Sequence, residues 1–199
     1  MRTESATLSK DKVLETKKPA IIDAAIRLFS EKGIKATTVR DIAREAGVAE
    51  GTLYRHWKGK EELAQELFYD NKKRFKEELE DALRGVSGTK NKLRRAIVAF
   101  YAFAQREPLL YKFLILSSHY ELRMLLPRTP KPLEVIIGIV KEGIEAGELK
   151  KIELPFAGAI IVGAITKLSD FKRMGVIEKE LEEYIDPVTE FLWEALKVK

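Results

Sequence analysis

Two short helical patterns separated by a glycine limit the possible folds of this chain more than any other stretch. They lie in VRDIAREAGVAEGTLYRHW, residues 39–57. In the first pattern the apolar residues follow the helical spacing i, i+3, i+4, i+7: Val39, Ile42, Ala43 and Ala46. Gly47 comes next, where a left-handed residue commonly ends a helix. Two helices joined by such a tight turn are typical of a helix-turn-helix unit.

The second pattern, at residues 50–57, has a narrow apolar side and many hydrogen-bonding side chains. Successive residues of a helix are rotated by about 100° around its axis. Trp57 therefore lies within about 40° of Leu53, whereas Gly51 and Arg55 point outward. The major groove of B-DNA admits one helix, whose outer side chains reach base edges and phosphates while its inner side is held by other helices. The pattern therefore indicates a DNA-recognition helix.

Helical signals continue on both sides of this unit, and no stretch reads as a β-strand. One helix is expected from Pro19 to Gly33, and a long one from Lys60 to Leu83 or Arg84. Five further helices are expected at 90–106, 109–122, 133–146, 154–174 and 179–197. The predicted fold class is all-α, with an N-terminal three-helix helix-turn-helix domain and a C-terminal helical bundle.

Several kinds of chemistry are disfavoured by what the sequence lacks. The 199 residues include no cysteine, and the two histidines, His56 and His119, lie far apart. With no glycine-rich phosphate loop either, we expect no metal site, no cofactor and no enzymatic activity. The N-terminus has no apolar signal core, and the longest uncharged apolar run, 154–165, is too short to cross a bilayer. A cytoplasmic protein without a membrane partner is expected.

The charge distribution suits a nucleic-acid partner only weakly. The net charge is +5, and residues 1–64 hold 13 Lys and Arg against 10 Asp and Glu. One such domain would bind weakly, so we expect a homodimer that doubles the phosphate contacts. Two recognition helices about 34 Å apart predict a near-palindromic site on double-stranded DNA.

Residues 19–68 resemble the DNA-binding domain of the tetracycline repressor (TetR) family of bacterial and archaeal regulators. The resemblance is strongest in TTVRDIAREAGVAEGTLYRHWKGKEEL at 37–63. The glycine turn, GTLY, the aromatic residue after His56 and the opening of the next helix all occur in register. No family motif is found in the rest of the chain.

The resemblance implies a DNA-binding domain at 19–64 and a divergent ligand-binding and dimerisation domain at 65–199. Residues 1–18 precede them as a flexible, polar arm. This arm is either a disordered tail or a basic segment that touches DNA.

Outward angles and the resemblance together give eight candidate DNA contacts: Thr37, Thr38, Gly51, Thr52, Tyr54, Arg55, His56 and Lys60. By position, Thr38 matches the threonine that caps the family's second helix and touches phosphate. Tyr54 and Lys60 match the family's phosphate-binding tyrosine and lysine. Arg55 occupies a variable position that often reads bases, where it could bind guanine through two hydrogen bonds.

Two residues depart from the family pattern. Ala49 stands where a Ser or Thr cap is usual, and Glu50 stands where a lysine is usual. Glu50 either favours the positive end of its own helix or accepts a hydrogen bond from a cytosine amine.

The C-terminal domain is rich in aromatic residues, which predicts either a solid core or a pocket for a small apolar or amphipathic ligand. The candidate pocket residues are Phe75, Phe100, Phe103, Phe113, His119 and Met124.

The last two helices are expected to form a four-helix dimer interface, as the resemblance implies. The segment FAGAIIVGAITKL at 156–168 sets small residues at close intervals, and the last helix is apolar on one side. The candidate interface residues are Gly158, Ile161, Gly163, Ile165, Val188, Phe191 and Leu192.

The resulting hypothesis is a homodimeric transcription regulator, most simply a repressor released from its operator when a ligand binds. The alternative is an architectural DNA-binding protein of the same fold that has no small-molecule ligand.

Overall fold

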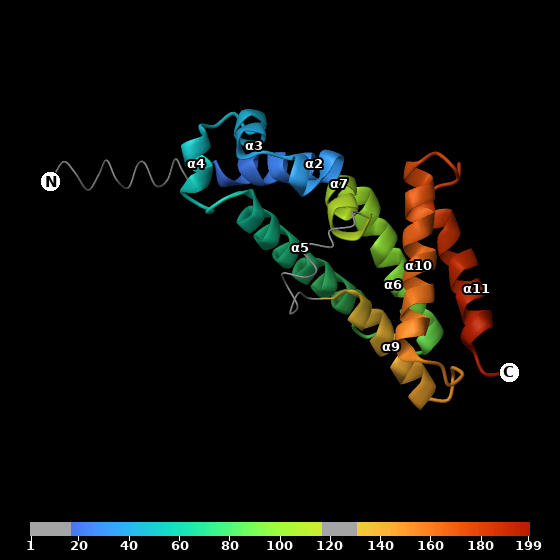
Figure 1. Ribbon diagram of the computed structural model, residues 1–199. Coiled ribbons are helices and arrows are strands. Elements are labelled where there is room, and N and C mark those ends of the chain that lie inside the picture. Colours follow the sequence, from blue (N-terminus) through green and yellow to red (C-terminus); the bar gives the residue numbers. More distant parts are fainter. Residues whose placement is uncertain (1–16, 117–130) are drawn as a thin grey trace. The chain divides into compact units, whose positions relative to one another are not determined.

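The computed structural model describes residues 17–116 and 131–199, and within these ranges every regular element is helical (Figure 1). The elements are α2 (Lys18–Ala36), α3 (Val39–Glu45), α4 (Glu50–Tyr54), α5 (Lys60–Leu83), α6 (Thr89–Arg106), α7 (Pro108–Tyr111), the π-helical turn η1 (Lys112–Leu116), α9 (Leu133–Glu145), α10 (Leu154–Arg173), the 3₁₀ turn η2 (Leu181–Tyr184) and α11 (Ile185–Leu196). The predicted all-α class is confirmed.

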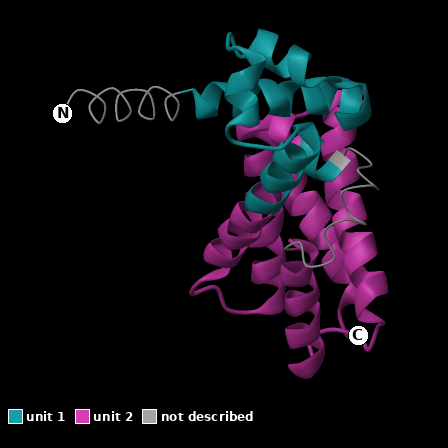
Figure 2. Ribbon diagram, turned by 60° about the vertical axis from the view of Figure 1, so that its left-hand side comes forward, with its two compact units in different colours: residues 1–70, 112–127 teal, residues 71–111, 128–199 magenta. Residues whose placement is uncertain are grey.

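The chain forms two compact units (Figure 2). Of the described residues, unit 1 contains 17–70 and 112–116, and unit 2 contains 71–111 and 131–199. Helix α5 is continuous and contributes its first part to unit 1 and its remainder to unit 2.

Unit 1 is built on the apolar stripe of α2, which packs on α3, while α3 packs on α4. Ile21 and Phe29 of α2 are fully buried. The Phe29 ring stacks on Phe113 with 5.9 Å between centroids, and Phe68 meets Phe113 edge-on at 6.0 Å. The helix breaks at Gly33, where φ is +83°, as the sequence predicted.

Three predicted helix bounds differ from the structure. Helix α4 ends at Tyr54 rather than at 57. Of the predicted helix 109–122, α7 and η1 cover the part up to 116, and the rest lies outside the described residues. The last helix begins with η2 and turns α-helical only at Ile185, because a capping box between Glu180 and Glu183 starts a 3₁₀ turn first.

Unit 2 packs α10 on α9, α9 on α6 and α6 on α11. Two glycines permit this close approach. A Cβ on Gly158 of α10 would lie 2.9 Å from Leu133 Cδ1 of α9. A Cβ on Gly143 of α9 would lie 2.7 Å from Thr89 Cγ2 and 2.8 Å from Leu149 Cγ. Any side chain at either position forces the neighbouring residues apart.

Within the described ranges one helix, α10, is long and apolar enough to cross a membrane, and 28% of its apolar window is buried. Core helices of soluble proteins meet the same criteria of length and composition. The outward side of α10 carries Phe156 and Ile160, which are 56% and 50% exposed. This helix therefore has an apolar side that the described residues leave exposed.

Replacing Gly143 with alanine is expected to lower the free energy of unfolding by about 1–3 kcal/mol, because the new methyl group overlaps Thr89 and Leu149. Gly138, on the same helix, has nothing within 4 Å of the position that a Cβ would occupy, so Gly138→Ala should be neutral or stabilising by up to about 1 kcal/mol. Urea unfolding of both variants measures the difference. Equal effects would contradict the close packing at Gly143.

Candidate DNA-binding surface

Helix α3 begins with a reciprocal cap. The Thr38 hydroxyl accepts a hydrogen bond from the Asp41 amide at 3.0 Å, and the Asp41 carboxylate accepts from the Thr38 amide at 3.0 Å. This capping box satisfies two amides that the first turn of a helix leaves without partners. The start of α3 is therefore fixed by its own sequence.

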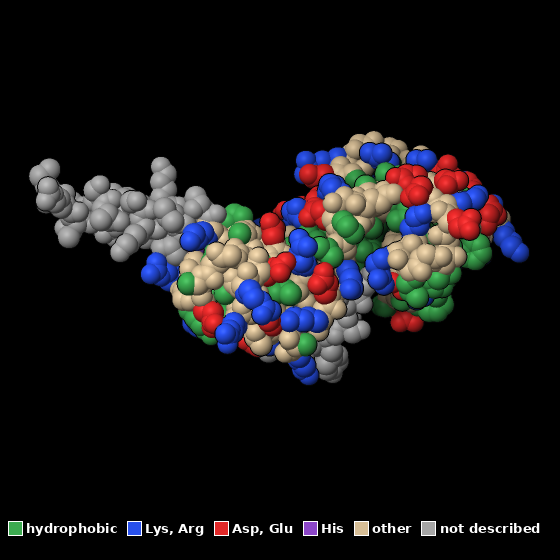
Figure 3. Space-filling view, turned by 90° about the horizontal axis from the view of Figure 1, so that it is seen from above, with side chains coloured by type: hydrophobic (Ala, Val, Ile, Leu, Met, Phe, Trp, Pro, Cys, Tyr) green, Lys and Arg blue, Asp and Glu red, His purple; other side chains and the backbone are tan. Residues whose placement is uncertain are grey.

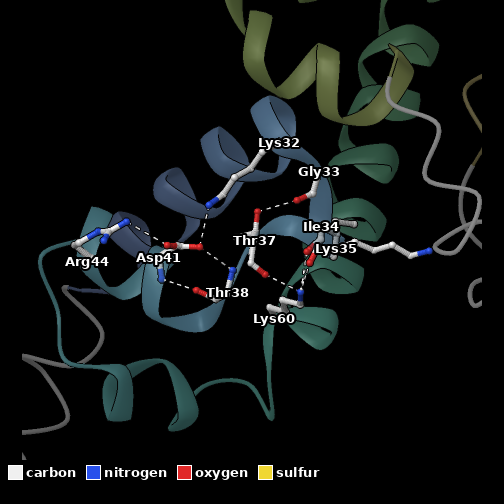
Figure 4. Close-up of polar contacts among 9 residues, drawn as sticks. All are labelled: Lys32, Gly33, Ile34, Lys35, Thr37, Thr38, Asp41, Arg44 and Lys60. Carbon is white, nitrogen blue, oxygen red and sulfur yellow. Dashed lines mark hydrogen bonds and ion pairs between the residues drawn. The ribbon is translucent and has the colours of Figure 1, made fainter.

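Asp41 also joins α3 to α2. Its carboxylate accepts from Lys32 Nζ at 2.9 Å and from Arg44 at 3.1 Å (Figure 4). The hydrogen bond from Lys32, together with those from Thr38, holds the pKa of the carboxyl far below its ordinary value. Asp41 is therefore charged at any physiological pH, and the end of α2 stays tied to the start of α3.

The turn between α3 and α4 is a glycine turn, as the sequence predicted. Gly47 has φ of +64°, and its amide donates to the Arg44 carbonyl at 3.2 Å. The Val48 amide donates back to the Ala43 carbonyl at 2.9 Å. These bonds close the end of α3 and direct the chain into α4.

Helix α4 has one buried side and one exposed side. Leu53 and Trp57 are 0% and 2% exposed, whereas Tyr54 is 55% exposed. Gly51 and Arg55 are also exposed, and nothing lies within 4 Å of the position of a Cβ on Gly51. The outer side of α4 therefore exposes a guanidinium, a phenol and the backbone at Gly51.

A polar contact holds the buried side in place. Trp57 Nε1 donates to one Glu66 oxygen at 2.7 Å, and Lys18 Nζ donates to the other at 3.1 Å. The Lys18 ammonium also lies 5.2 Å from the centroid of a Trp57 ring. This contact links the start of α2 and the first turns of α5 to Trp57, which follows α4.

Lys60, the first residue of α5, closes the other end of α2. Its ammonium donates to three carbonyls, those of Ile34 at 2.9 Å, Lys35 at 3.0 Å and Thr37 at 2.6 Å (Figure 4). Carbonyls at a helix C-terminus have no partners within the helix and carry partial negative charge, which a cation stabilises. An ammonium has three donors, so these bonds use all of them, and the Glu61 carboxylate lies 3.8 Å from the same nitrogen.

Comparison with known proteins agrees with this geometry. The sequence model for bacterial regulatory proteins of the tetR family matches residues 21–67. A fatty acid metabolism regulator protein of Bacillus subtilis is 31% identical over 150 residues, which are 73% of this chain and 77% of that protein. The chain belongs to the TetR family of transcription regulators. The expected helix-turn-helix and the expected absence of enzymatic activity agree with this membership.

Solved structures of this TetR-family fold extend the likeness to most of the chain. The transcriptional regulator FadR of Bacillus subtilis in complex with stearoyl-CoA is 31% identical, covers 87% of this chain and 96% of its own, and superposes with a TM-score of 0.74. The fatty acid degradation regulator FadR of Bacillus halodurans shares the fold, with a TM-score of 0.77 at 24% identity over 92% of this chain and 97% of its own. The repressor KstR2 of Mycolicibacterium smegmatis is 42% identical over 55 residues, 28% of this chain and 27% of its own.

Three of the eight candidate DNA contacts have side chains that are partly or fully buried, or hydrogen-bonded within the chain. Thr37 is fully buried, and its hydroxyl donates to the Gly33 carbonyl at 2.8 Å. Lys60 caps α2 with all three of its donors. His56 is half-buried, and its Nε2 is enclosed without a hydrogen-bond partner among the described residues. In the free protein, Thr37 and Lys60 therefore have contacts within the chain, and their roles as DNA contacts stay predictions.

The other five candidates lie on or beside the open side of α3 and α4. Thr38, Gly51, Tyr54 and Arg55 are exposed, and Thr52 is half-buried. Arg55 is the charged residue among them, and it forms no ion pair with a described residue.

Sequence reasoning missed Arg40. This residue lies in the first turn of α3, is exposed, and forms no ion pair with any described residue. The signal was present, because at about 100° per residue Arg40 lies about 160° from Ile42, the fully buried residue of its helix. Its position next to the Thr38 cap makes it an additional candidate DNA contact.

On the face of the molecule drawn in Figure 3, Lys and Arg side chains are interspersed with acidic ones. The net charge of the chain is also small, +5. A small net charge predicts only modest sequence-independent attraction to DNA.

The candidate pocket residues separate into groups. Phe75 stacks on Phe103 at 4.3 Å and meets Phe100 edge-on at 4.8 Å, and all three are buried in unit 2. Phe113 belongs to the core of unit 1. His119 and Met124 lie outside the described residues.

Unit 2 also contains an open groove of about 460 Å³ between the end of α5, the start of α6 and α9. None of the candidate pocket residues lines it. Its two lysines are paired with acidic neighbours, Lys76 with Glu134 at 2.9 Å and Lys92 with Glu142 at 2.5 Å.

Five of the seven candidate interface residues belong to the core of the chain itself. Gly158, Ile161, Ile165, Val188 and Leu192 are buried. Gly163 and Phe191 are exposed, Phe191 by 73%. Of the predicted interface residues, only Gly163 and Phe191 therefore lie on a side that the core leaves exposed.

Lys60→Met should lower the free energy of unfolding by about 1–3 kcal/mol, because three helix-end carbonyls lose their donor while the apolar stem remains. DNA affinity should fall with the loss of the α2–α5 link, but its salt dependence should not change. A lost phosphate contact would reduce the slope of log affinity against log salt by about one. Urea unfolding and DNA titration at several salt concentrations measure both.

Lys58→Met is the matched control, since Lys58 is exposed and two residues away. It should leave stability within about 0.5 kcal/mol of the wild type. A Lys60 variant that is as stable as this control, with a reduced salt slope, would restore the phosphate-contact role.

Proposed function

We propose that this TetR-family protein is a cytoplasmic, homodimeric repressor that binds a near-palindromic operator and is released from it by a long-chain acyl-CoA. Residues 19–64 bind DNA, and residues 65–199 bind the ligand and form the dimer. The observation that carries the proposal is the open side of α3 and α4, where Arg40, Tyr54 and Arg55 are exposed, while Lys60 and Trp57 hold the helices on the buried side.

In the proposed complex, Arg55 reads a guanine through two hydrogen bonds, because its guanidinium is exposed on the outer side of α4. Tyr54, Thr38 and Arg40 bind phosphates on either side of the groove. Gly51 lets the backbone approach the DNA, since no side chain fills the space above it.

Long-chain acyl-CoA is proposed as the ligand because FadR of Bacillus subtilis, 31% identical over nearly its whole length, was solved with stearoyl-CoA. An acyl-CoA is amphipathic, as the ligand expected from the sequence is. Release follows if the acyl-CoA binds better to a conformation in which the two recognition helices no longer fit one operator.

Dimerisation is assigned to the outward side of α10 and α11. Phe156, Ile160 and Gly163 follow the spacing i, i+4, i+7 on α10, and Phe191 and Ala195 follow i, i+4 on α11. The two helices are in contact, and we propose that these exposed residues together form the apolar surface that a partner covers. A contiguous apolar surface on a single chain is commonly covered by a partner.

The DNA-binding role is tested by selecting bound sequences from random duplex DNA and titrating the selected duplex. Arg55→Ala is expected to weaken binding by about 1–3 kcal/mol per half-site, since the guanine contact is lost, and to relax preference at that base. Arg84→Ala, which removes an 81% exposed arginine that follows α5, should bind as the wild type does. Failure to enrich any sequence would contradict an operator-binding regulator.

The ligand role is tested on the same complex by adding stearoyl-CoA below its micelle concentration. At least tenfold weaker operator binding is expected, about 1.4 kcal/mol of coupling, while free coenzyme A has no effect. Unchanged operator affinity would exclude acyl-CoA as the releasing ligand.

Phe191→Glu should convert the dimer to a monomer in sedimentation equilibrium, because an unpaired carboxylate would be buried against the partner at a cost of several kcal/mol. Tyr69→Glu, at a 40% exposed aromatic of α5, is the control and should remain dimeric. A dimeric Phe191→Glu variant would show that the chains associate elsewhere.

A further inference from the structure

The open groove of unit 2 includes a glycine from the middle of a helix. Gly138 belongs to α9, and nothing lies within 4 Å of the position that a Cβ would occupy there. Gly143, further along the same helix, is required by close packing against Thr89 and Leu149, but no such neighbour requires Gly138. Glycine is, after proline, the least favourable residue within a helix. The sequence therefore loses helix stability at Gly138 and leaves a hollow there.

Apolar side chains line this hollow. The groove holds about 460 Å³, and its apolar lining residues are Leu83, Val86, Val135 and Ile139. Val135 and Ile139 are buried, whereas Leu83 and Val86 are half-buried. The apolar part of a ligand placed over Gly138 would exchange water for apolar contacts, which is favourable.

Two glutamates lie on either side of the glycine. Glu134, Gly138 and Glu142 are spaced four residues apart, so they follow one side of α9. With a rise of 1.5 Å per residue, each glutamate is about 6 Å from Gly138 along the helix axis. Lys92 of α6 pairs with Glu142 at 2.5 Å. The end of the groove at Glu142 therefore has no net charge.

The end at Glu134 has an additional negative charge. The Lys76 ammonium lies 2.9 Å from a Glu134 oxygen and 3.8 Å from a Glu80 oxygen. Its hydrogen bond to Glu134 raises the pKa of Lys76, so one cation is shared by two carboxylates. The side chains of Glu134 and Glu80 are 53% and 51% exposed, and that of Lys76 is 28% exposed. Because a carboxylate has about four acceptor sites, both can accept a further donor.

We propose that this groove binds an organic cation, with its ammonium group at Glu134 and Glu80 and its apolar body over Gly138. The charged lining residues are two lysines and three glutamates, a net charge of −1 that matches one positive charge on the ligand. The site is separate from the proposed response to acyl-CoA and does not depend on it. Its failure would leave the release of the operator by stearoyl-CoA unaffected.

The test compares decylammonium with decanoate, which has the same number of carbon atoms and the opposite charge, by calorimetric titration below the micelle concentrations. The wild type should bind decylammonium at least about tenfold more tightly, because the extra carboxylate attracts the ammonium and repels the carboxylate. Equal affinity for the two compounds, or no binding of decylammonium, would overturn the assignment.

Gly138→Leu locates the site. The new side chain begins in open space, so the variant should keep the melting temperature of the wild type while losing at least about tenfold in affinity for decylammonium. Ala146→Leu, at an exposed position directly after α9, is the matched control and should bind as the wild type does. Unchanged binding by Gly138→Leu would show that the cation binds elsewhere.

Glu80→Gln tests the charge while keeping the shape of the side chain. The preference for decylammonium over decanoate should fall about threefold, because the remaining pair of Lys76 and Glu134 has no net charge. Glu77→Gln is the matched control, since Glu77 also has a lysine four residues earlier, Lys73 at 3.9 Å, but does not line the groove. A preference that is unchanged in Glu80→Gln, or that falls equally in both variants, would contradict the charge complementarity.

Discussion

The arrangement of the DNA-binding helices depends on the ammonium of Lys60. It joins the first residue of α5 to the last carbonyls of α2 and to the Thr37 carbonyl, immediately before α3 begins. Helix α4 is only five residues long and cannot hold its own orientation. Its position is set by Leu53 and Trp57 on the buried side and by the bond from Trp57 to Glu66 on α5. The exposed side is then free to carry residues chosen for DNA.

Features that depend on neighbouring residues were predictable from the sequence. The Thr38 cap, the left-handed Gly47 and the inward Leu53 all follow from spacing within a few residues, and the structure has each of them. Lys60 was different, because its carbonyl partners lie 23 to 26 residues earlier in the chain. A lysine at a helix start suggests an anion, and only the fold reveals that helix-end carbonyls are nearer.

Unit 2 was harder to predict because its helices are apolar on more than one side. Glycines 158 and 163 look alike in the sequence, yet a Cβ on Gly158 would contact Leu133, whereas nothing lies within 4 Å of one on Gly163. The choice between core and exposed surface depends on which neighbour packs there, and periodicity alone does not give that.

The closed coordination of Lys60 also determines its chemical reactivity. A lysine reacts with acylating reagents through the lone pair of its neutral amine, which attacks the acyl carbon after the ammonium loses a proton. The three protons of the Lys60 ammonium are held by carbonyls, and its side chain is only 19% exposed. Lys58, two residues earlier, is exposed to solvent. Lysine-modifying reagents should therefore label Lys58 first, and acylation of Lys60 would report opening of the corner between α2 and α5.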